Sequence, residues 1–505
     1  MHAPRCSNRL VPRLLAGALA AALAGCAVRP DFVKPTPAAP DDWTSWRSGD
    51  ASLRIPTEAT QALPAQWWQA FNDATLDALQ RRASDASPDL HTAALRFAQA
   101  RAQRSTVAAQ RGPEVNASGS ATRQRQSESG AGTRMIGIMG ADPSLTELLA
   151  EPFSLYQAGF DASWELDLWG RVRRSVEAAD ADVGQQAALL DLARLSLASD
   201  VARNYFELRT AQRQIRLMRE DIAALEDRAA LLQARVEGGV LDHTDLQRQR
   251  AELAALKAQL PPLLAQEAAS ANQIALLLGE RPGALRAELA PREADAGTSL
   301  PDLALGLPSE VALRRPDIRA AEARLHSATA SIGIARADLY PSIRLGATFG
   351  YESYLSSEFS DWGSRTWSVG PSLNLPIFDH GRRKATVQLR ELQQQEAAIN
   401  YQQTVLKAWQ EIDDALSAYG AEQRQARELQ TRSDAAGDAY RLAQARYDGG
   451  VTDFTAVLDA QRSYLQARRD LAASEGRLST RYVTVNKAIG NVPLDTENAA
   501  GKGME

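Results

Sequence analysis

Hydrophobic and polar residues alternate almost without interruption from Leu155 to Leu168. The apolar positions of this stretch are Tyr156, Ala158, Phe160, Ala162, Trp164, Leu166 and Leu168, with polar or small residues between them. Because successive side chains point to opposite sides of a strand, the pattern predicts a two-faced strand over 155–168. After Gly170 the period becomes helical and predicts one continuous helix over 171–237, roughly 100 Å long at 1.5 Å per residue.

The same arrangement occurs twice in the chain. Pro88-Asp89 recurs as Pro316-Asp317 at an offset of 228 residues. Gly170-Arg171 recurs as Gly381-Arg382 at an offset of 211 residues. The two offsets differ by 17 residues, which we assign mostly to a Ser- and Gly-rich loop over 127–151 of the first copy. One structural unit is therefore expected in duplicate.

Each copy is predicted to contain two strands and three long helices. The strands are expected at about 114–125, 155–168, 342–352 and 365–377, and the helices at about 89–111, 171–237, 243–278, 317–339, 382–447 and 455–489. The summed length of the two shorter helices of a copy nearly equals the length of its long helix. We therefore expect the two shorter helices to stack end to end and run beside the long one. Pro261 and Pro262 lie inside the helix 243–278 and are expected to kink or interrupt it.

The predicted strands have the properties of membrane-spanning strands. Each is about as long as a transmembrane strand needs to be, and aromatic residues gather near the strand ends. Four strands cannot close a barrel, and an open sheet edge in hydrocarbon would leave backbone N–H and C=O groups unpaired. The pattern therefore predicts that several chains close a barrel together, continued by a hollow tunnel of helices.

The first 26 residues have the pattern of a targeting signal. Arg5, Arg9 and Arg13 precede an apolar run over 14–23, which is too short to cross a bilayer as a helix. The run leads into Leu23-Ala24-Gly25-Cys26, the pattern of a bacterial lipoprotein signal, in which cleavage exposes the Cys26 thiol for lipid attachment. An ordinary secretory signal with an incidental cysteine is the alternative.

The expected division of the chain follows from these boundaries. It comprises a signal peptide at 1–25, a lipid-anchored tether at 26–72, a first repeat at 73–290, a connector at 291–308, a second repeat at 309–490 and a tail at 491–505.

Composition narrows the possible functions. The 505 residues are 24% charged and 44% hydrophobic, which is the globular range. The net charge of −5 gives no broad electrostatic case for nucleic-acid binding. The five histidines are scattered without metal-ligand spacing, and neither a phosphate-binding loop nor a nucleophile elbow is found. We therefore expect a protein that lets solutes pass through it and does not catalyse a reaction. We expect no cofactor apart from the lipid on Cys26.

Several short motifs, in order along the duplicated unit, resemble the TolC-like outer-membrane efflux factors, especially their NodT-type lipoprotein branch. They are Cys26-Ala27-Val28-Arg29-Pro30-Asp31-Phe32, Trp67-Trp68 with Leu76 and Leu79, Ala275-Leu276-Leu277-Leu278-Gly279, Arg314-Arg315-Pro316-Asp317-Ile318, Leu339-Tyr340-Pro341, Pro376-Ile377-Phe378-Asp379 with Gly381-Arg382, and Leu458-Asp459-Ala460-Gln461-Arg462. The resemblance implies a mainly helical homotrimer with a twelve-stranded β-barrel and a twelve-helix periplasmic tunnel. It also implies the outer membrane of a Gram-negative bacterium and docking to an inner-membrane transporter through a periplasmic adaptor.

Two candidate sites lie near the Gly-Gly turns between long helices. Asp448, Asp453 and Asp459, with Arg462, are expected to form rings in a threefold assembly that narrow a periplasmic aperture and favour cations. Asp459 resembles the gate aspartate of the family by position. Helix capping is the competing explanation, which we favour for Asp453 and for Asp242 at the other turn.

The turns themselves are candidate contacts for the adaptor. They comprise Gly238, Gly239 and Val240 in the first copy and Gly449, Gly450 and Val451 in the second. Exposed hairpin tips suit end-to-end packing with another coiled coil, while the glycines also fit ordinary helix C-caps, and both readings can hold.

Three functions compete for a chain with this pattern. A non-conducting structural lipoprotein is excluded, because a coiled coil with a purely structural role would not need strands with a lipid-facing side. A passive duct for drugs or small toxic solutes and a duct for type I protein secretion would share this fold. The lipoprotein motif favours efflux by resemblance alone, so secretion remains the alternative.

Overall fold

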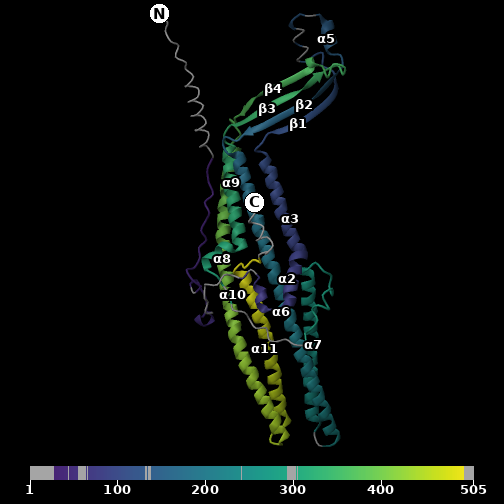
Figure 1. Ribbon diagram of the computed structural model, residues 1–505, viewed down its shortest axis with the longest axis vertical. Helices are drawn as coiled ribbons and strands as arrows, with labels where there is room; N and C mark the ends of the chain where they lie inside the picture. Colours follow the sequence, from purple (N-terminus) through teal and green to yellow (C-terminus); the bar gives the residue numbers. More distant parts are fainter. Residues whose placement is uncertain are drawn as a thin grey trace. The chain divides into compact units, whose positions relative to one another are not determined.

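The computed structural model describes residues 28–43, 45–54, 64, 66–130, 134, 138–140, 142–239, 242–292, 303 and 305–493. The chain is mainly helical with one four-stranded sheet (Figure 1), which confirms the predicted fold class. It divides into two compact units. Of the described residues, the sheet unit takes those within Met1–Lys34, Ala100–Val183 and Arg324–Ala398, and the helical unit takes those within Pro35–Gln99, Gly184–Ala323 and Ile399–Glu505.

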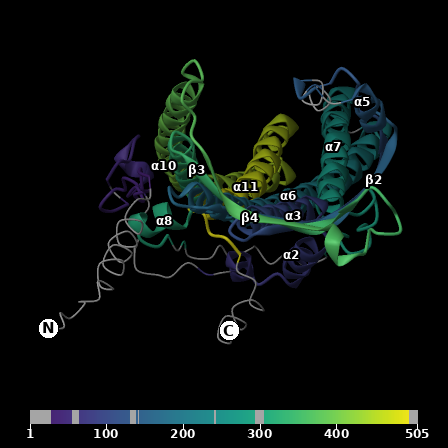
Figure 2. The same cartoon turned by 90° about the horizontal axis from the view of Figure 1, so that it is seen from above.

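The sheet is antiparallel and follows the order of the chain. Its strands are β1 (Glu114–Gln124), β2 (Phe153–Leu166), β3 (Ser342–Ser353) and β4 (Arg365–Asn374), paired in the order β1-β2-β3-β4. Ala162 lies opposite Val115 on one side and Ala347 on the other, so apolar residues of neighbouring strands share a face. Figure 2 shows the strands side by side in a curved sheet. Among the described residues, β1 and β4 form its two open edges.

Two strands end earlier than their alternation predicts. The predicted strand 155–168 stops at Leu166, because the Asp167 carboxylate accepts the backbone N–H groups of Val172 and Arg173 and so caps the following helix. The predicted strand 365–377 stops at Asn374, which lies opposite Ser342, the first residue of β3. Beyond that pair β3 offers no further partner for the ladder.

The helices repeat as the strands do. They are α2 (Ala74–Ala86), α3 (Pro88–Ala109), α5 (Pro143–Leu149), α6 (Arg171–Glu237), α7 (His243–Leu277), α8 (Pro308–Arg314), α9 (Pro316–Ala337), α10 (Arg382–Asp448) and α11 (Phe454–Ala488). Corresponding helices have equal lengths: 22 residues for α3 and α9, 67 for α6 and α10, and 35 for α7 and α11. No helix of the described part of the chain is at once long and apolar enough to cross a bilayer.

Helix α7 continues through both of its prolines, so of the expected kink or interruption at Pro261 and Pro262 the interruption is wrong, while the kink stays a prediction. A proline inside a helix leaves the carbonyl four residues earlier without its N–H partner. Here those carbonyls belong to Lys257 and Ala258, which are exposed, as are the prolines themselves. Water can therefore satisfy the freed carbonyls, and the helix is retained.

The core of the helical unit is rich in aromatic residues. Phe71 packs on Phe206 at a ring-centroid distance of 4.6 Å and on Tyr482 at 5.1 Å. The segment before α2 docks through tryptophan indoles, since Trp43 Nε1 donates to the carbonyl of Gly306 at 2.8 Å. Aromatic anchoring holds a segment with little regular structure against the helices.

Candidate functional site

The two long hairpins of the helical unit, α6–α7 and α10–α11, turn at the same end (Figure 1). A tip cluster of buried apolar side chains lies just behind the turns. It consists of Leu232 from α6, Leu246 from α7, and Phe454, Val457 and Leu458 from α11, with Tyr440 and Tyr447 of α10 packed against it. The cluster joins the two hairpins, so the Gly-Gly turns of the two repeats lie together.

The second glycine of each turn ends a helix. Gly239 has a φ of 72° and Gly450 a φ of 71°, the left-handed region that favours glycine. The Gly450 N–H donates to the carbonyl of Tyr447 at 2.9 Å, which satisfies one of the last carbonyls of α10. Val451 is largely exposed beyond the turn, whereas Val240 lies outside the described residues.

Two of the acidic residues near the turns are helix caps. The Asp242 carboxylate accepts the Thr244 hydroxyl at 3.0 Å and its backbone N–H at 3.3 Å. These hydrogen bonds, the one from the hydroxyl first, lower the pKa of Asp242 below its ordinary value. Asp453 accepts the backbone N–H of Ala456 at 3.1 Å. Both carboxylates therefore satisfy the first turns of α7 and α11.

Asp459 and Asp448 are placed differently. Asp459 lies in the second turn of α11 with its side chain 69% exposed, and its nearest cation is Arg462, at 4.0 Å. Asp448 is the last residue of α10 and is exposed. The exposed Asp459 carboxylate lies beyond the capping position, whereas those of Asp242 and Asp453 accept backbone N–H groups of their own helices.

Arg462 connects α7 and α11, the return helices that follow the Gly-Gly turns of the two hairpins. Its Nε donates to Glu252 Oε2 at 2.6 Å, which links α11 to α7. Arg248 of α7 makes a second link nearby, donating to the Thr455 hydroxyl at 2.9 Å. Glu252 belongs to none of the motifs that stand out in the sequence. The repeat offset of 211 places Arg462 on Ala251, next to Glu252, so the duplication was the available signal.

Farther from the turns, a buried carboxylate joins α6 to α11. Asp221 is nearly inaccessible and lies 3.4 Å from Arg468 and 3.6 Å from Arg469. Burial raises the pKa of Asp221, and the two guanidinium groups partly offset that effect. The cluster has the geometry of a structural ion-pair network between neighbouring helices.

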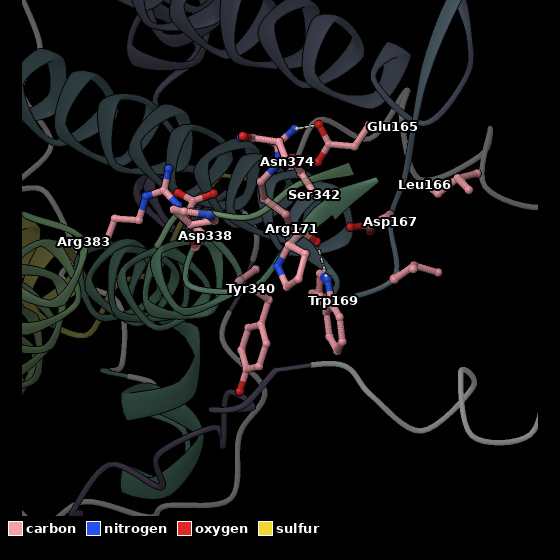
Figure 3. A pocket seen from close by; sticks show the side chains of 14 residues that line it. Glu165, Leu166, Asp167, Trp169, Arg171, Asp338, Tyr340, Ser342, Asn374 and Arg383 are labelled. Carbon is pink, nitrogen blue, oxygen red and sulfur yellow. Dashed lines mark hydrogen bonds and ion pairs between the residues drawn. The ribbon is translucent and has the colours of Figure 1, made fainter. Parts of the chain in front are cut away.

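A small cavity of about 80 Å³ lies in the sheet unit, where strands give way to helices (Figure 3). Trp169 stacks on Tyr340 at 4.8 Å and donates from Nε1 to the carbonyl of Pro341 at 2.7 Å. Arg171 pairs with Glu165 through two hydrogen bonds, of 2.7 and 3.0 Å. Arg171 and Glu165 neutralise each other. The residues around the cavity therefore connect strands to helices and do not form a reactive site.

Within the described residues no group of three or more His, Cys, Asp or Glu side chains could hold a metal ion. His326 instead stacks on Phe32 at 4.2 Å and contacts Glu177 at 3.0 Å. Cys26, the candidate lipidation site, lies outside the described residues.

Comparison with known proteins agrees with this architecture. Residues 79–280 and 307–491 match the family model described as outer membrane efflux protein. The chain is 34% identical over 448 residues to outer membrane protein OprJ of Pseudomonas aeruginosa, covering 88% of each protein. It is 32% identical to the toluene efflux pump outer membrane protein TtgF of Pseudomonas putida, covering 94% of this chain and 95% of TtgF. The solved structure of the outer-membrane channel OprN matches with a TM-score of 0.82 and 33% identity, covering 92% of this chain and 99% of that chain. The chain therefore belongs to the outer membrane efflux protein family, whose members are transport channels and not enzymes.

Proposed function

We propose that three copies of this protein close a barrel through the outer membrane, and that the closed assembly exports drugs or small toxic solutes. The observation that carries the proposal is the two-faced sheet with β1 and β4 open at its edges. In hydrocarbon an open edge would leave a row of backbone N–H and C=O groups unpaired, so the sheet needs neighbours on both sides. Exposed apolar side chains such as Phe160, Phe349 and Val369 suit a lipid-facing surface.

The proposal is tested by the mass and conductance of the purified protein. We expect a trimer in detergent and discrete conductance steps in planar bilayers. Lipid-phase probes should label Phe160→Cys and Leu345→Cys variants, while water-soluble thiol reagents should not. A stable, insulating monomer labelled by aqueous reagents at those positions would refute the proposal.

A lipid anchor on Cys26 is part of this proposal, together with the domain boundaries expected from the sequence. Support comes from the start of the described chain, because the Val28 N–H donates to the carbonyl of Trp169 at 3.3 Å. Arg174 in turn donates to the carbonyl of Val28 and pairs with Asp31. These contacts hold residues two positions after Cys26 at the strand-to-helix junction of the sheet unit, where attached acyl chains would enter the same bilayer.

The tips of the hairpins are proposed to serve as aperture and docking surface. In a trimer, three copies of Asp459, with Asp453 and Asp448 near the turns, would place negative charge around the opening and favour cations. The Arg462–Glu252 pair would then restrain the return helices that border it. Gly238, Gly239 and Val240, with Gly449, Gly450 and Val451, are the proposed contacts for a periplasmic adaptor that connects the duct to an inner-membrane transporter.

The substrate class is proposed from the relatives rather than from the chain. The name of TtgF assigns that protein to a toluene pump. A deletion strain tested against antibiotics, dyes and organic solvents is expected to become sensitive to some of them and to recover with the cloned gene. Unchanged susceptibility together with the loss of a secreted protein would favour a secretion duct instead.

A further inference from the structure

A cavity of about 460 Å³, which we call the α7 pocket, lies in the helical unit between α6, α7 and the loop that follows α7. Four of its lining residues are buried, namely Leu208 and Gln212 of α6 and Leu285 and Leu289 of the loop. Leu264 of α7 also lines it and is 37% exposed, so the cavity opens to solvent at its rim. Small-molecule sites in proteins have volumes of about 300–1,000 Å³, and the α7 pocket falls in that range.

The equivalent place in the second repeat is occupied by aromatic side chains. The hairpins α6–α7 and α10–α11 have equal helix lengths and are related by the offset of 211 residues, which places Tyr419 on Leu208 and Tyr482 on Ala271. Both tyrosines are 2% exposed, and their ring centroids lie 6.3 Å apart. Because protein interiors are close-packed, smaller residues at the same positions leave space behind. The α7 pocket therefore lies where the second repeat has two aromatic rings.

The pocket also holds a carboxylate where the second repeat has an apolar side chain. Glu267 of α7 lines the pocket, and its equivalent on α11 is Leu478, which is buried. Gln212 Nε2 donates to Glu267 Oε1 at 3.0 Å and to the carbonyl of Leu289 at 2.7 Å. In the part of the chain that the structure describes, this half-buried carboxylate forms no ion pair. A carboxylate with only a neutral partner favours a cationic ligand.

Two arginines lie near the pocket without pairing with Glu267. Arg209 donates from Nη1 to Gln212 Oε1 at 2.8 Å and to the carbonyl of Ala290 at 3.0 Å. Arg209 thus holds the amide in the orientation that offers its N–H groups to Glu267. Arg286 lines the pocket but is exposed, so water and salt screen its charge. The fixed and less accessible charge of the pocket is that of Glu267.

We propose that the α7 pocket binds an aromatic amine. The ring of the ligand lies between α6 and α7, in the space that Tyr419 and Tyr482 fill in the second repeat, and its ammonium group donates to Glu267. The two differences between the repeats set the ligand class, since the missing rings leave room for an aromatic body and the added carboxylate selects a cation. The site goes beyond the proposed export function, because it lies in the helical unit away from the turns and binds whether or not the protein conducts.

Three probes with one carbon skeleton test the charge preference. Phenylbutylamine, phenylbutanol and phenylbutyrate are cationic, neutral and anionic at pH 7, and their binding to the full-length protein in lipid nanodiscs is measured by calorimetry, with empty nanodiscs subtracted. The amine should bind roughly tenfold more tightly than the alcohol, because it gains a charge-assisted hydrogen bond to Glu267. The carboxylate of phenylbutyrate should make it the weakest of the three.

Two variants separate the charge of the pocket from its space. Glu267→Gln keeps the size of the side chain and removes its charge, so the amine should bind no better than the alcohol. Ala271→Tyr introduces the side chain of the second repeat and should abolish binding of all three probes. The matched control is Glu226→Gln, which removes a carboxylate that pairs with Lys257 between the same two helices and does not line the pocket. This control should keep the preference for the amine.

Each outcome has a distinct meaning. A preference for the amine that Glu267→Gln removes and Glu226→Gln keeps supports the proposal. Equal binding of amine and alcohol, or tightest binding of phenylbutyrate, overturns the choice of a cation. Binding that survives Ala271→Tyr in a folded protein overturns the assignment to this pocket, and absence of binding by all three probes overturns the site. A protein that binds the amine as expected but does not conduct overturns the proposed duct and leaves the site standing.

Discussion

Breaking the Arg462–Glu252 ion pair should favour an open aperture. This 2.6 Å charge-assisted contact joins α11 to α7 just behind the turns. The Arg462 side chain is half-exposed and that of Glu252 is more covered. Glutamine at either position keeps most of the volume and removes the charge pair, so the two return helices lose a restraint without losing apolar packing.

The size of the effect follows from the exposure of the pair. A partly exposed ion pair contributes about 0.5–1 kcal/mol, and three symmetric copies that open together would contribute about 1.5–3 kcal/mol. Since 1.4 kcal/mol is a factor of ten, the ratio of open to closed channels should rise roughly 10- to 100-fold. Both Arg462→Gln and Glu252→Gln should show this rise.

Single-channel recording in planar bilayers measures that ratio directly. The double variant should resemble each single variant, because the second change has no pair left to break. Exchanging the charges, Arg462→Glu with Glu252→Arg, should restore part of the closed population. Arg432→Gln is the matched control, since Arg432 pairs with Asp470 at 2.8 Å between α10 and α11 without linking α7 to α11. Unchanged open probability in both single variants would show that the pair does not restrain the aperture.

Four further predictions concern single residues. Asp459→Ala should raise single-channel conductance and weaken block by divalent cations, and unchanged traces would contradict the aperture role. Arg315→Gln should cost about 3 kcal/mol, seen as a lower unfolding temperature in detergent, because the buried guanidinium binds Asp317, Glu411 and two backbone carbonyls. Burial alone would raise the pKa of Asp73, but hydrogen bonds from Arg292 and Tyr205 hold it below its ordinary value of 3.8. The ionised Asp73 therefore stabilises the fold above that pH, so the deficit of Asp73→Asn at pH 7 should shrink as the pH falls through the folded pKa. Cys26→Ser should abolish incorporation of labelled palmitate, and retained label would exclude Cys26 as the anchor.

Periodicity predicted the long elements because many residues contribute to each of them. The helix from Arg171 to Glu237 matches its predicted bounds, and the alternating positions of β2 face their partners as expected. The short helices α5 and α8 were not predicted, since seven residues make too few turns for a period to emerge. Strand ends depended on individual contacts such as the cap at Asp167, which alternation does not encode.

Much of the candidate site was predictable, but its connections were not. The paired glycines marked both turns, and the acidic residues around them could be separated into caps and an exposed carboxylate only from hydrogen bonds. Asp453 and Asp459 are six residues apart, yet one accepts a backbone N–H of its own helix and the other extends into solvent. The Glu252–Arg462 contact depends on how two distant helices pack, which no local spacing specifies.

The two prolines of α7 give the return helices unequal bending stiffness. At Pro261 and Pro262 two backbone hydrogen bonds of α7 are already missing, so bending the helix there does not have to break those bonds. The matching stretch of α11 contains no proline, so bending it must lengthen or break backbone hydrogen bonds. Elastic deformation of the hairpins should therefore concentrate in the first repeat, with α11 moving as a stiff rod. The two repeats, which share their order of helices and strands, should therefore differ in mechanics, with the first hairpin the more easily bent.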